Sequence, residues 1–275
     1  KGTLKGHSKG VTHAAWNQDG SLLASVSSDE TVKLWDLTTM KEKATLGHTR
    51  DNPECTCPHS RTSGRDAPAS LAGLFAEEEI SSKCPVKGHS VNVWSLGWNH
   101  DGSVLASGSS DNTVCLWTVD GQAKDTLIGH SSYVLFVAFS PDCKTLASAS
   151  GDQTVKLWDL SGVKTVEKGT LVGHSDRVTS VAWNQNGSLL ASASYDWTVK
   201  LWDPKTMEEK GTMQGHTRDN TKCLCYPDGW FFSNPKCPVR GHSESVHTVV
   251  WNHDASLLAS ASSDRTVRLW DPKTM

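Results

Sequence analysis

The sequence predicts an all-β protein made of repeated units of about 40 residues. A Gly-His pair recurs along the chain, beginning at Gly6, Gly47, Gly88, Gly129, Gly173, Gly215 and Gly241. Five of these pairs are followed by the same pattern: an apolar run ending in Trp or Phe, a polar turn, a Leu-Ala-Ser-x-Ser run, an Asp, and a run ending in Leu-Trp. A fixed period of this length is typical of a stacked array or a propeller.

The end of each full unit helps to decide between a stacked array and a propeller. The last run closes with Trp-Asp at Trp35, Trp158, Trp202 and Trp270, and Trp117-Thr118 is the exception. Together with the leading Gly-His pair and the constant spacing, this pattern resembles the WD-repeat family. The resemblance implies a β-propeller of four-stranded blades around a central channel.

The units divide the chain into regular and irregular parts. We expect a single propeller over residues 1–275, with full units at 6–46, 88–128, 129–172, 173–214 and 241–275 and irregular segments at 47–87 and 215–240. Each full unit predicts three strands, as in 178–183, 189–194 and 198–202, with β-branched and apolar residues between turn signals such as Asn186-Gly187. A fourth strand is expected in the stretch leading to the next Gly-His, as in 168–172.

The irregular segments leave the number of blades open. Segment 215–240 has the pattern of the first two strands of a unit, whereas segment 47–87 aligns only through Cys55-Thr56-Cys57. We expect seven blade positions, five full and two degenerate. The alternative is five blades with two long loops.

The two ends of the sequence suggest how the ring closes. Joining Asp271–Met275 to Lys1–His7 would nearly reproduce the internal junction that begins at Asp203. We therefore expect Lys1–Leu4 to close the ring as the outer strand of the last blade, which would remove exposed sheet edges.

Every full unit contains a Ser, a His and an Asp, the residue types of a hydrolase triad. A catalytic site would not be copied five times around a ring. The family resemblance instead implies a buried hydrogen-bond network from Asp through His and Ser to the Trp indole. The five expected networks are His7, Ser25, Asp29 and Trp35; His89, Ser107, Asp111 and Trp117; His130, Ser148, Asp152 and Trp158; His174, Ser192, Asp196 and Trp202; and His242, Ser260, Asp264 and Trp270.

Cysteines offer a second kind of candidate site. Cys55, Cys57 and Cys84 in one irregular segment correspond to Cys223, Cys225 and Cys237 in the other, with His48, His59 or His216 as further ligands. Three Cys and one His suit zinc chemically, but the spacing is poor for a zinc site. Free thiols, structural zinc and a disulfide all remain open here, and we expect no metal and no cofactor.

The resemblance also implies a binding face around the channel mouth, formed by residues at the start of each first strand and before each unit's Asp. Large side chains gather there in neighbouring units, and aromatic residues and Arg dominate binding hot spots. The predicted partner-binding residues are Trp94, Tyr133, Leu135, Arg177, Tyr195, Trp197 and His247.

Composition limits the class of partner. The chain has a net charge of −3 and no basic stripe, and no apolar run is long enough to span a membrane. Eight cysteines are too few for a disulfide-stapled protein of this length, which favours an intracellular setting, cytoplasmic or nuclear. We expect a non-catalytic scaffold that binds a protein or peptide on the channel-mouth face, without nucleic acid or membrane partners. The alternative is a structural subunit of a larger assembly that uses blade edges and the irregular segments.

Overall fold

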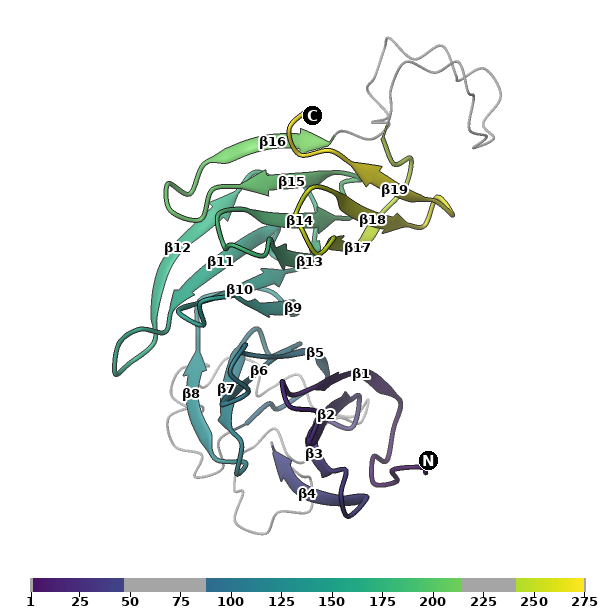
Figure 1. Ribbon diagram of the computed structural model, residues 1–275, viewed down its shortest axis with the longest axis vertical. Coiled ribbons are helices and arrows are strands. Elements are labelled where there is room, and N and C mark those ends of the chain that lie inside the picture. Colours follow the sequence, from purple (N-terminus) through teal and green to yellow (C-terminus); the bar gives the residue numbers. More distant parts are fainter. Residues whose placement is uncertain (1, 47–87, 214–240, 275) are drawn as a thin grey trace, which may run out of the picture.

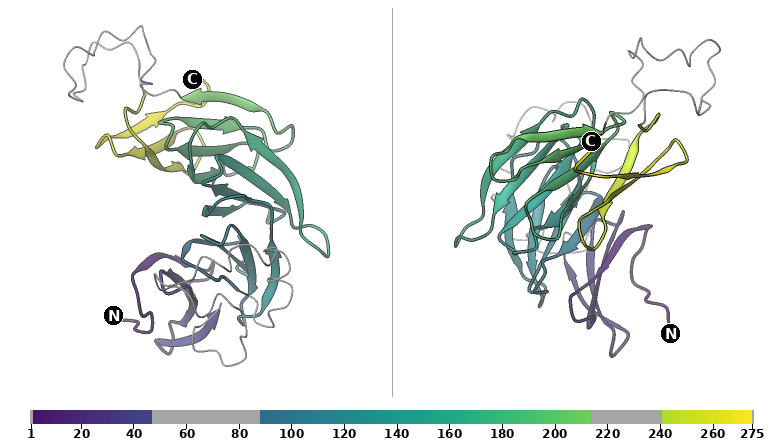
Figure 2. Two further views of the ribbon diagram at one scale, coloured as in Figure 1. Left: turned by 180° about the vertical axis from the view of Figure 1, so that it is seen from behind. Right: turned by 45° about the horizontal axis from the view of Figure 1, so that its top comes forward.

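The computed structural model describes residues 2–46, 88–213 and 241–274, and the regular structure in these residues is entirely β-strand. The strands form five antiparallel sheets. Figure 1 shows the sheets following one another in chain order along a curve, with the two termini at its ends, and the views in Figure 2 show the same curve from behind and tilted. This architecture agrees with the expected propeller, and each sheet is called a blade below. None of the described residues forms a helix that could cross a membrane.

The blades contain their strands in chain order. The first blade consists of β1 (Val11–Trp16), β2 (Leu22–Ser27), β3 (Val32–Asp36) and β4 (Lys41–Leu46). The second consists of β5 (Val93–Trp98), β6 (Val104–Ser109), β7 (Val114–Thr118) and β8 (Ala123–Leu127). The third consists of β9 (Val134–Phe139), β10 (Thr145–Ser150), β11 (Thr154–Asp159) and β12 (Val166–Val172). The fourth consists of β13 (Val178–Trp183), β14 (Leu190–Ser194), β15 (Val199–Trp202) and β16 (Glu209–Met213). The fifth consists of β17 (Val246–Trp251), β18 (Leu258–Ser262) and β19 (Val267–Trp270).

The turn after the first strand shows why the repeat keeps certain residues. Gly20, Gly102 and Gly187 have φ values of 70°, 71° and 70°, a region that glycine enters without steric cost. Gly187 belongs to the predicted Asn186-Gly187 turn, and Gly20 and Gly102 follow Asp in the equivalent turns of the first and second blades. Each turn reverses the chain so that the first and second strands pair antiparallel.

The hydrophobic core lies between neighbouring blades. Val32 and Leu34 of β3 are fully buried, and they share a cluster with Val93 and Leu96 of β5 in the next blade. The same pairing of a third strand with the following first strand builds the cluster between the fourth and fifth blades. Each blade therefore depends on its neighbour to bury its apolar faces.

Hydrogen bonds repeat across these interfaces. The indole N–H of Trp98 donates to the carbonyl of Ala15 at 3.2 Å, and that of Trp251 donates to the carbonyl of Ala182 at 3.0 Å. The indole N–H of Trp183 in the fourth blade likewise donates to the carbonyl of Ala138 in the third blade at 3.0 Å. Three of the five aromatic residues that close the first strands, Trp98, Trp183 and Trp251, thus join blades by a directed bond in addition to packing.

The expected count of seven blade positions is not confirmed. The first and second blades are in direct contact, and so are the fourth and fifth. No blade position therefore lies between either pair, although we expected the irregular segments 47–87 and 215–240 to fill two such positions. The segments themselves lie outside the described residues. Each of these pairs of neighbouring blades buries one shared apolar core.

The expected ring closure by Lys1–Leu4 is also not found. Residues 2–10 contain no strand, and the fifth blade has three strands within the described part of the chain. The backbone at Gly2 lies beside Met40 and that at Gly6 beside Trp35, so the N-terminal segment follows its own blade. Within the described residues, apolar side chains of the first and fifth blades are exposed at the two ends of the curve: Trp16 is 60% exposed, and Val267 and Leu269 are 68% and 67% exposed.

The hydrogen bond from Trp251 to the neighbouring blade can be tested against Trp16, which closes the equivalent strand of the first blade. Replacing Trp251 by Phe keeps an aromatic ring but removes the donor to Ala182, and we expect it to lower the free energy of unfolding by about 0.5–1.5 kcal/mol. The control is Trp16→Phe, because Trp16 has no such acceptor among the residues described, and it should change stability by less than about 0.5 kcal/mol. Urea denaturation of both variants measures the difference, and equal losses would contradict this role for the indole.

Candidate functional site

The structure brings the predicted His, Ser, Asp and Trp residues together in every blade. In the fourth blade, Nδ1 of His174 lies 2.7 Å from the Asp196 carboxylate and Nε2 lies 2.7 Å from the Ser192 hydroxyl oxygen. The Trp202 indole donates to the same hydroxyl oxygen at 2.8 Å. The first, second, third and fifth blades contain the same chain of contacts.

Two further donors complete each network, and sequence reasoning missed both. The Thr198 hydroxyl donates to Asp196 at 2.6 Å, and the backbone N–H of Ser175 donates to the other carboxylate oxygen at 3.0 Å. A Thr two residues after the Asp occurs in all five full units, so the signal was present in the sequence. Each Asp thereby joins the Gly-His turn to the start of the third strand.

These contacts govern the ionisation of the buried carboxylates. Burial alone would raise the pKa of Asp196, but the hydrogen bond and charge interaction with His174, together with the bonds from Thr198 and Ser175, lower it to about 2. Burial is outweighed in the same way at Asp29, Asp111 and Asp264, whose pKa values are also lowered to about 2. The carboxylates are therefore held ionised in the folded protein.

The network is not arranged for nucleophilic catalysis. The side chain of Ser192 has no exposed surface, and its hydroxyl oxygen is already engaged by both His174 and Trp202. Ser107 and Ser148 are also fully buried. A nucleophile must reach a substrate carbonyl beside an oxyanion site, and these hydroxyls are enclosed by their own blades.

Four of the predicted partner-binding residues form one connected group across three blades. The Arg177 guanidinium lies 5.9 Å from the ring centroid of Tyr133. The backbone N–H of Tyr195 donates to the carbonyl of Arg177 at 3.0 Å, and the Tyr195 ring meets the His247 ring edge to face at 5.7 Å. We call Tyr133, Arg177, Tyr195 and His247 the mouth patch. It begins on the third blade and ends on the fifth.

The other three predicted residues are placed differently. Trp94 of the second blade is 37% exposed, and its indole donates to Ser110 of the same blade at 2.6 Å. Leu135 is half-buried in β9. Trp197 has a φ of 72° in the turn after Asp196, and within the described residues no ring contact or side-chain hydrogen bond joins it to the mouth patch.

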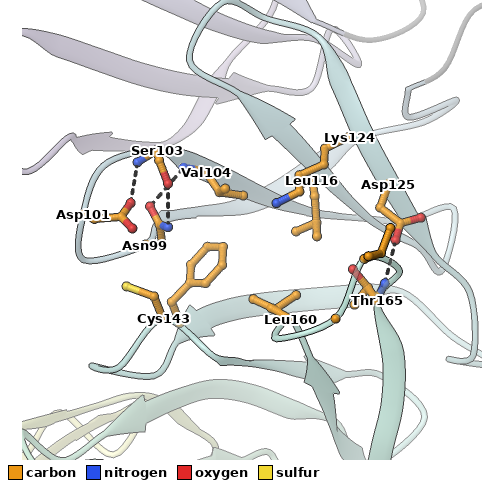
Figure 3. Close-up of a pocket in the computed structure, with 13 residues that line it drawn as sticks. Asn99, Asp101, Ser103, Val104, Leu116, Lys124, Asp125, Cys143, Leu160 and Thr165 are labelled. Carbon is orange, nitrogen blue, oxygen red and sulfur yellow. Dashed lines mark hydrogen bonds between the residues drawn. The ribbon is translucent and has the colours of Figure 1, made fainter.

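A cavity of about 220 Å³ opens between the second and third blades. It lies at the opposite ends of the strands from the mouth patch, because its walls include the turn at Asn99–Ser103 and the connection at Leu160–Thr165. Figure 3 shows that two acidic residues of this cavity accept backbone hydrogen bonds: Asp101 accepts the N–H of Ser103 in the same turn, and Asp125 of the second blade accepts that of Thr165 in the third blade. Within the described residues no hydrogen bond joins the Cys143 thiol to a base, so the cavity lacks the paired groups that covalent catalysis requires.

The candidate metal ligands cannot be placed. Cys55, Cys57, Cys84, Cys223, Cys225 and Cys237 lie outside the described residues, as do His48, His59 and His216. In the part of the chain that is described, Cys115 and Cys143 are free thiols, and no group of three or more His, Cys, Asp or Glu residues could hold a metal ion.

The lowered carboxylate pKa values predict how stability depends on pH. The folded pKa of Asp196 is about 2 against an ordinary value of 3.8, so the unfolded chain binds more protons between these values. The stabilisation is fully present above pH 3.8 and is lost as the pH falls through about 2. Asp196→Asn should reduce the slope of unfolding free energy against pH in this window, as measured by urea denaturation at stepped pH. An unchanged slope would contradict the assignment.

Comparison with known proteins places this geometry in a family. The family pattern described as "WD domain, G-beta repeat" matches residues 1–36, 81–118, 121–159, 165–203 and 233–271. The F-box-like/WD repeat-containing protein TBL1X of Mus musculus is 34% identical over 125 residues, which are 45% of this chain and 19% of that protein. The WD40 repeat-containing protein HOS15 of Arabidopsis thaliana is 33% identical over 45% of this chain and 16% of that protein.

A third relative, the anaphase-promoting complex subunit cdc20 of Dictyostelium discoideum, is 27% identical over 42% of this chain and 23% of that protein. The chain thus matches less than a quarter of the length of each of these relatives. The repeat pattern itself covers more than half of this chain. Because the matched repeats coincide with five blades that each hold the same Asp, His, Ser and Trp network, the chain belongs to the WD-repeat family.

Proposed function

We propose that this protein is a non-catalytic platform that binds a peptide or protein loop on the mouth patch. The observation that carries the proposal is the continuity of the patch: Tyr133, Arg177, Tyr195 and His247 come from three blades and contact one another in sequence. Tyr133 is 42% exposed, and Arg177 and His247 are also exposed. A rigid group of aromatic rings and an Arg is the side-chain composition typical of interface hot spots.

The rigidity of the supporting framework strengthens this proposal. Tyr195 immediately precedes Asp196, and Arg177 lies three residues after His174, so the buried network fixes the backbone beneath both side chains. Binding to a preorganised surface costs less ordering free energy than binding to flexible loops. The enclosed Ser hydroxyls are the reason for proposing a platform and not a hydrolase.

The names of two relatives support a protein partner. One is named as a subunit of the anaphase-promoting complex, and another, from Scheffersomyces stipitis, as a probable cytosolic iron-sulfur protein assembly protein. The proposal for this chain is accordingly a protein or peptide partner in an intracellular setting. Trp94, on the neighbouring second blade, would extend the surface that the partner contacts.

The test is a pull-down from cell lysate with the wild-type chain and a Trp94→Ala, Tyr195→Ala double variant. We expect the wild type to capture a partner that the double variant loses, since both changes remove large exposed or half-exposed aromatic rings without touching the buried network. Melting curves check that the double variant is folded.

The matched control is Val163→Ala, which removes a fully exposed apolar side chain from the β11–β12 connection at the opposite strand ends. It should capture the same partner as the wild type. If the double variant also keeps every partner, the mouth patch is not the binding surface. Contact through blade edges, as in a structural subunit, would then be favoured.

A further inference from the structure

The fifth blade differs from the other four in its outer edge. Each of the first four blades has a fourth strand hydrogen-bonded to its third strand, whereas β19 has no such neighbour among the described residues. The lack of this neighbour changes the burial of the blade's own residues. Trp270 is half-buried, whereas the equivalent Trp202 is 1% exposed. An unpaired strand edge is a ready template for pairing with another segment.

Three of the complete blades show what a fourth strand supplies. Lys200 of β15 donates to Glu209 at 2.7 Å and to Thr212 at 2.8 Å, both on β16. Lys33 contacts Glu42 and Thr45 of β4 in the same way, and Lys156 contacts Glu167 and Thr170 of β12. The fourth strand therefore presents a carboxylate and a hydroxyl to a cation on the third strand.

Arg268 occupies the position of these lysines in the fifth blade. It is paired with Ser260 in the same register that pairs Lys200 with Ser192. The Nε atom of Arg268 is buried and has no hydrogen-bond partner among the described residues. Because a buried donor without a partner is costly, this guanidinium is suited to accept a ligand with carboxylate and hydroxyl oxygens.

The apolar part of the missing strand can be defined in the same way. Fourth strands end in a buried Leu or Met, such as Leu46 and Met213, and Met213 lies opposite Val199 of β15. The equivalent of Val199 is Val267, which is 68% exposed, whereas Val199 is fully buried. A Leu or Met side chain placed opposite Val267 would cover part of this exposed surface.

We propose that β19 accepts an extended segment of another protein as a fourth strand, and that this segment carries a Glu, a Thr three residues later, and then a Leu or Met. The segment pairs antiparallel with β19. Its Glu and Thr contact Arg268, and its apolar residue packs on Val267. Main-chain hydrogen bonds provide affinity and these side chains provide specificity, as in other cases of strand addition. The N-terminal segment of the chain itself lies beside Met40 of the first blade and is not the occupant.

The test uses a fluorescently labelled peptide with the sequence of residues 206–213, Thr-Met-Glu-Glu-Lys-Gly-Thr-Met, titrated against the whole chain by fluorescence anisotropy. We expect saturable binding to the wild type and nearly equal binding to Arg268→Lys, because Lys fills this position in three other blades. Arg268→Glu should weaken binding at least about tenfold, since it replaces an attractive charge pair by a repulsive one. A peptide with Glu209→Lys should restore binding to Arg268→Glu, which also shows that this variant is folded.

Two results would overturn the proposal. One is no saturable binding to the wild type, or equal binding to the wild type and Arg268→Glu. The other comes from a chain that lacks residues 1–4: a gain in peptide affinity of about tenfold or more would show that the chain's own N-terminal segment competes for the edge. Unchanged affinity in that deletion supports an occupant from another protein.

Discussion

The structure depends on the hydrogen-bond chain that runs from a buried Asp through His and Ser to a Trp indole in each blade. In the fourth blade it connects the Gly-His turn at His174 with the second strand at Ser192 and the third strand at Trp202. A fully satisfied buried network is rigid and specifies one arrangement, whereas a partly satisfied one is costly. Five copies of this network give each blade the same internal geometry. Each blade can therefore pack on its neighbour through the same type of interface.

This internal rigidity also determines where variation is tolerated. The residue before each Asp and the residues at the start of each first strand are held by the network but are not members of it. They differ from unit to unit, as Ser28, Gly151 and Tyr195 show. The mouth patch is built from such positions, so the same framework that specifies the fold also holds the surface proposed to bind a partner.

Sequence reasoning reached the blade and its network because both are encoded locally and repeated five times. It failed where the answer depends on relations between blades. The spacing of Gly-His pairs does not show which blades are neighbours, whereas the direct bond from Trp98 to Ala15 does. The likeness of Lys1–Leu4 to an internal fourth strand predicted ring closure, but pairing with β19 depends on the distance between two ends of the curve. Contact between Tyr195 and His247 likewise depends on the angle between blades.

The central claim is that the network stabilises each blade as a cooperative unit, and a double-mutant cycle in the fourth blade tests it most directly. Ser192→Ala, Trp202→Phe and the double variant remove the shared hydroxyl oxygen, its indole donor, or both. The account predicts an interaction energy of about 0.5–3 kcal/mol, because either single change already breaks the same buried contact. An interaction energy near zero, with the two losses simply adding, would contradict the account.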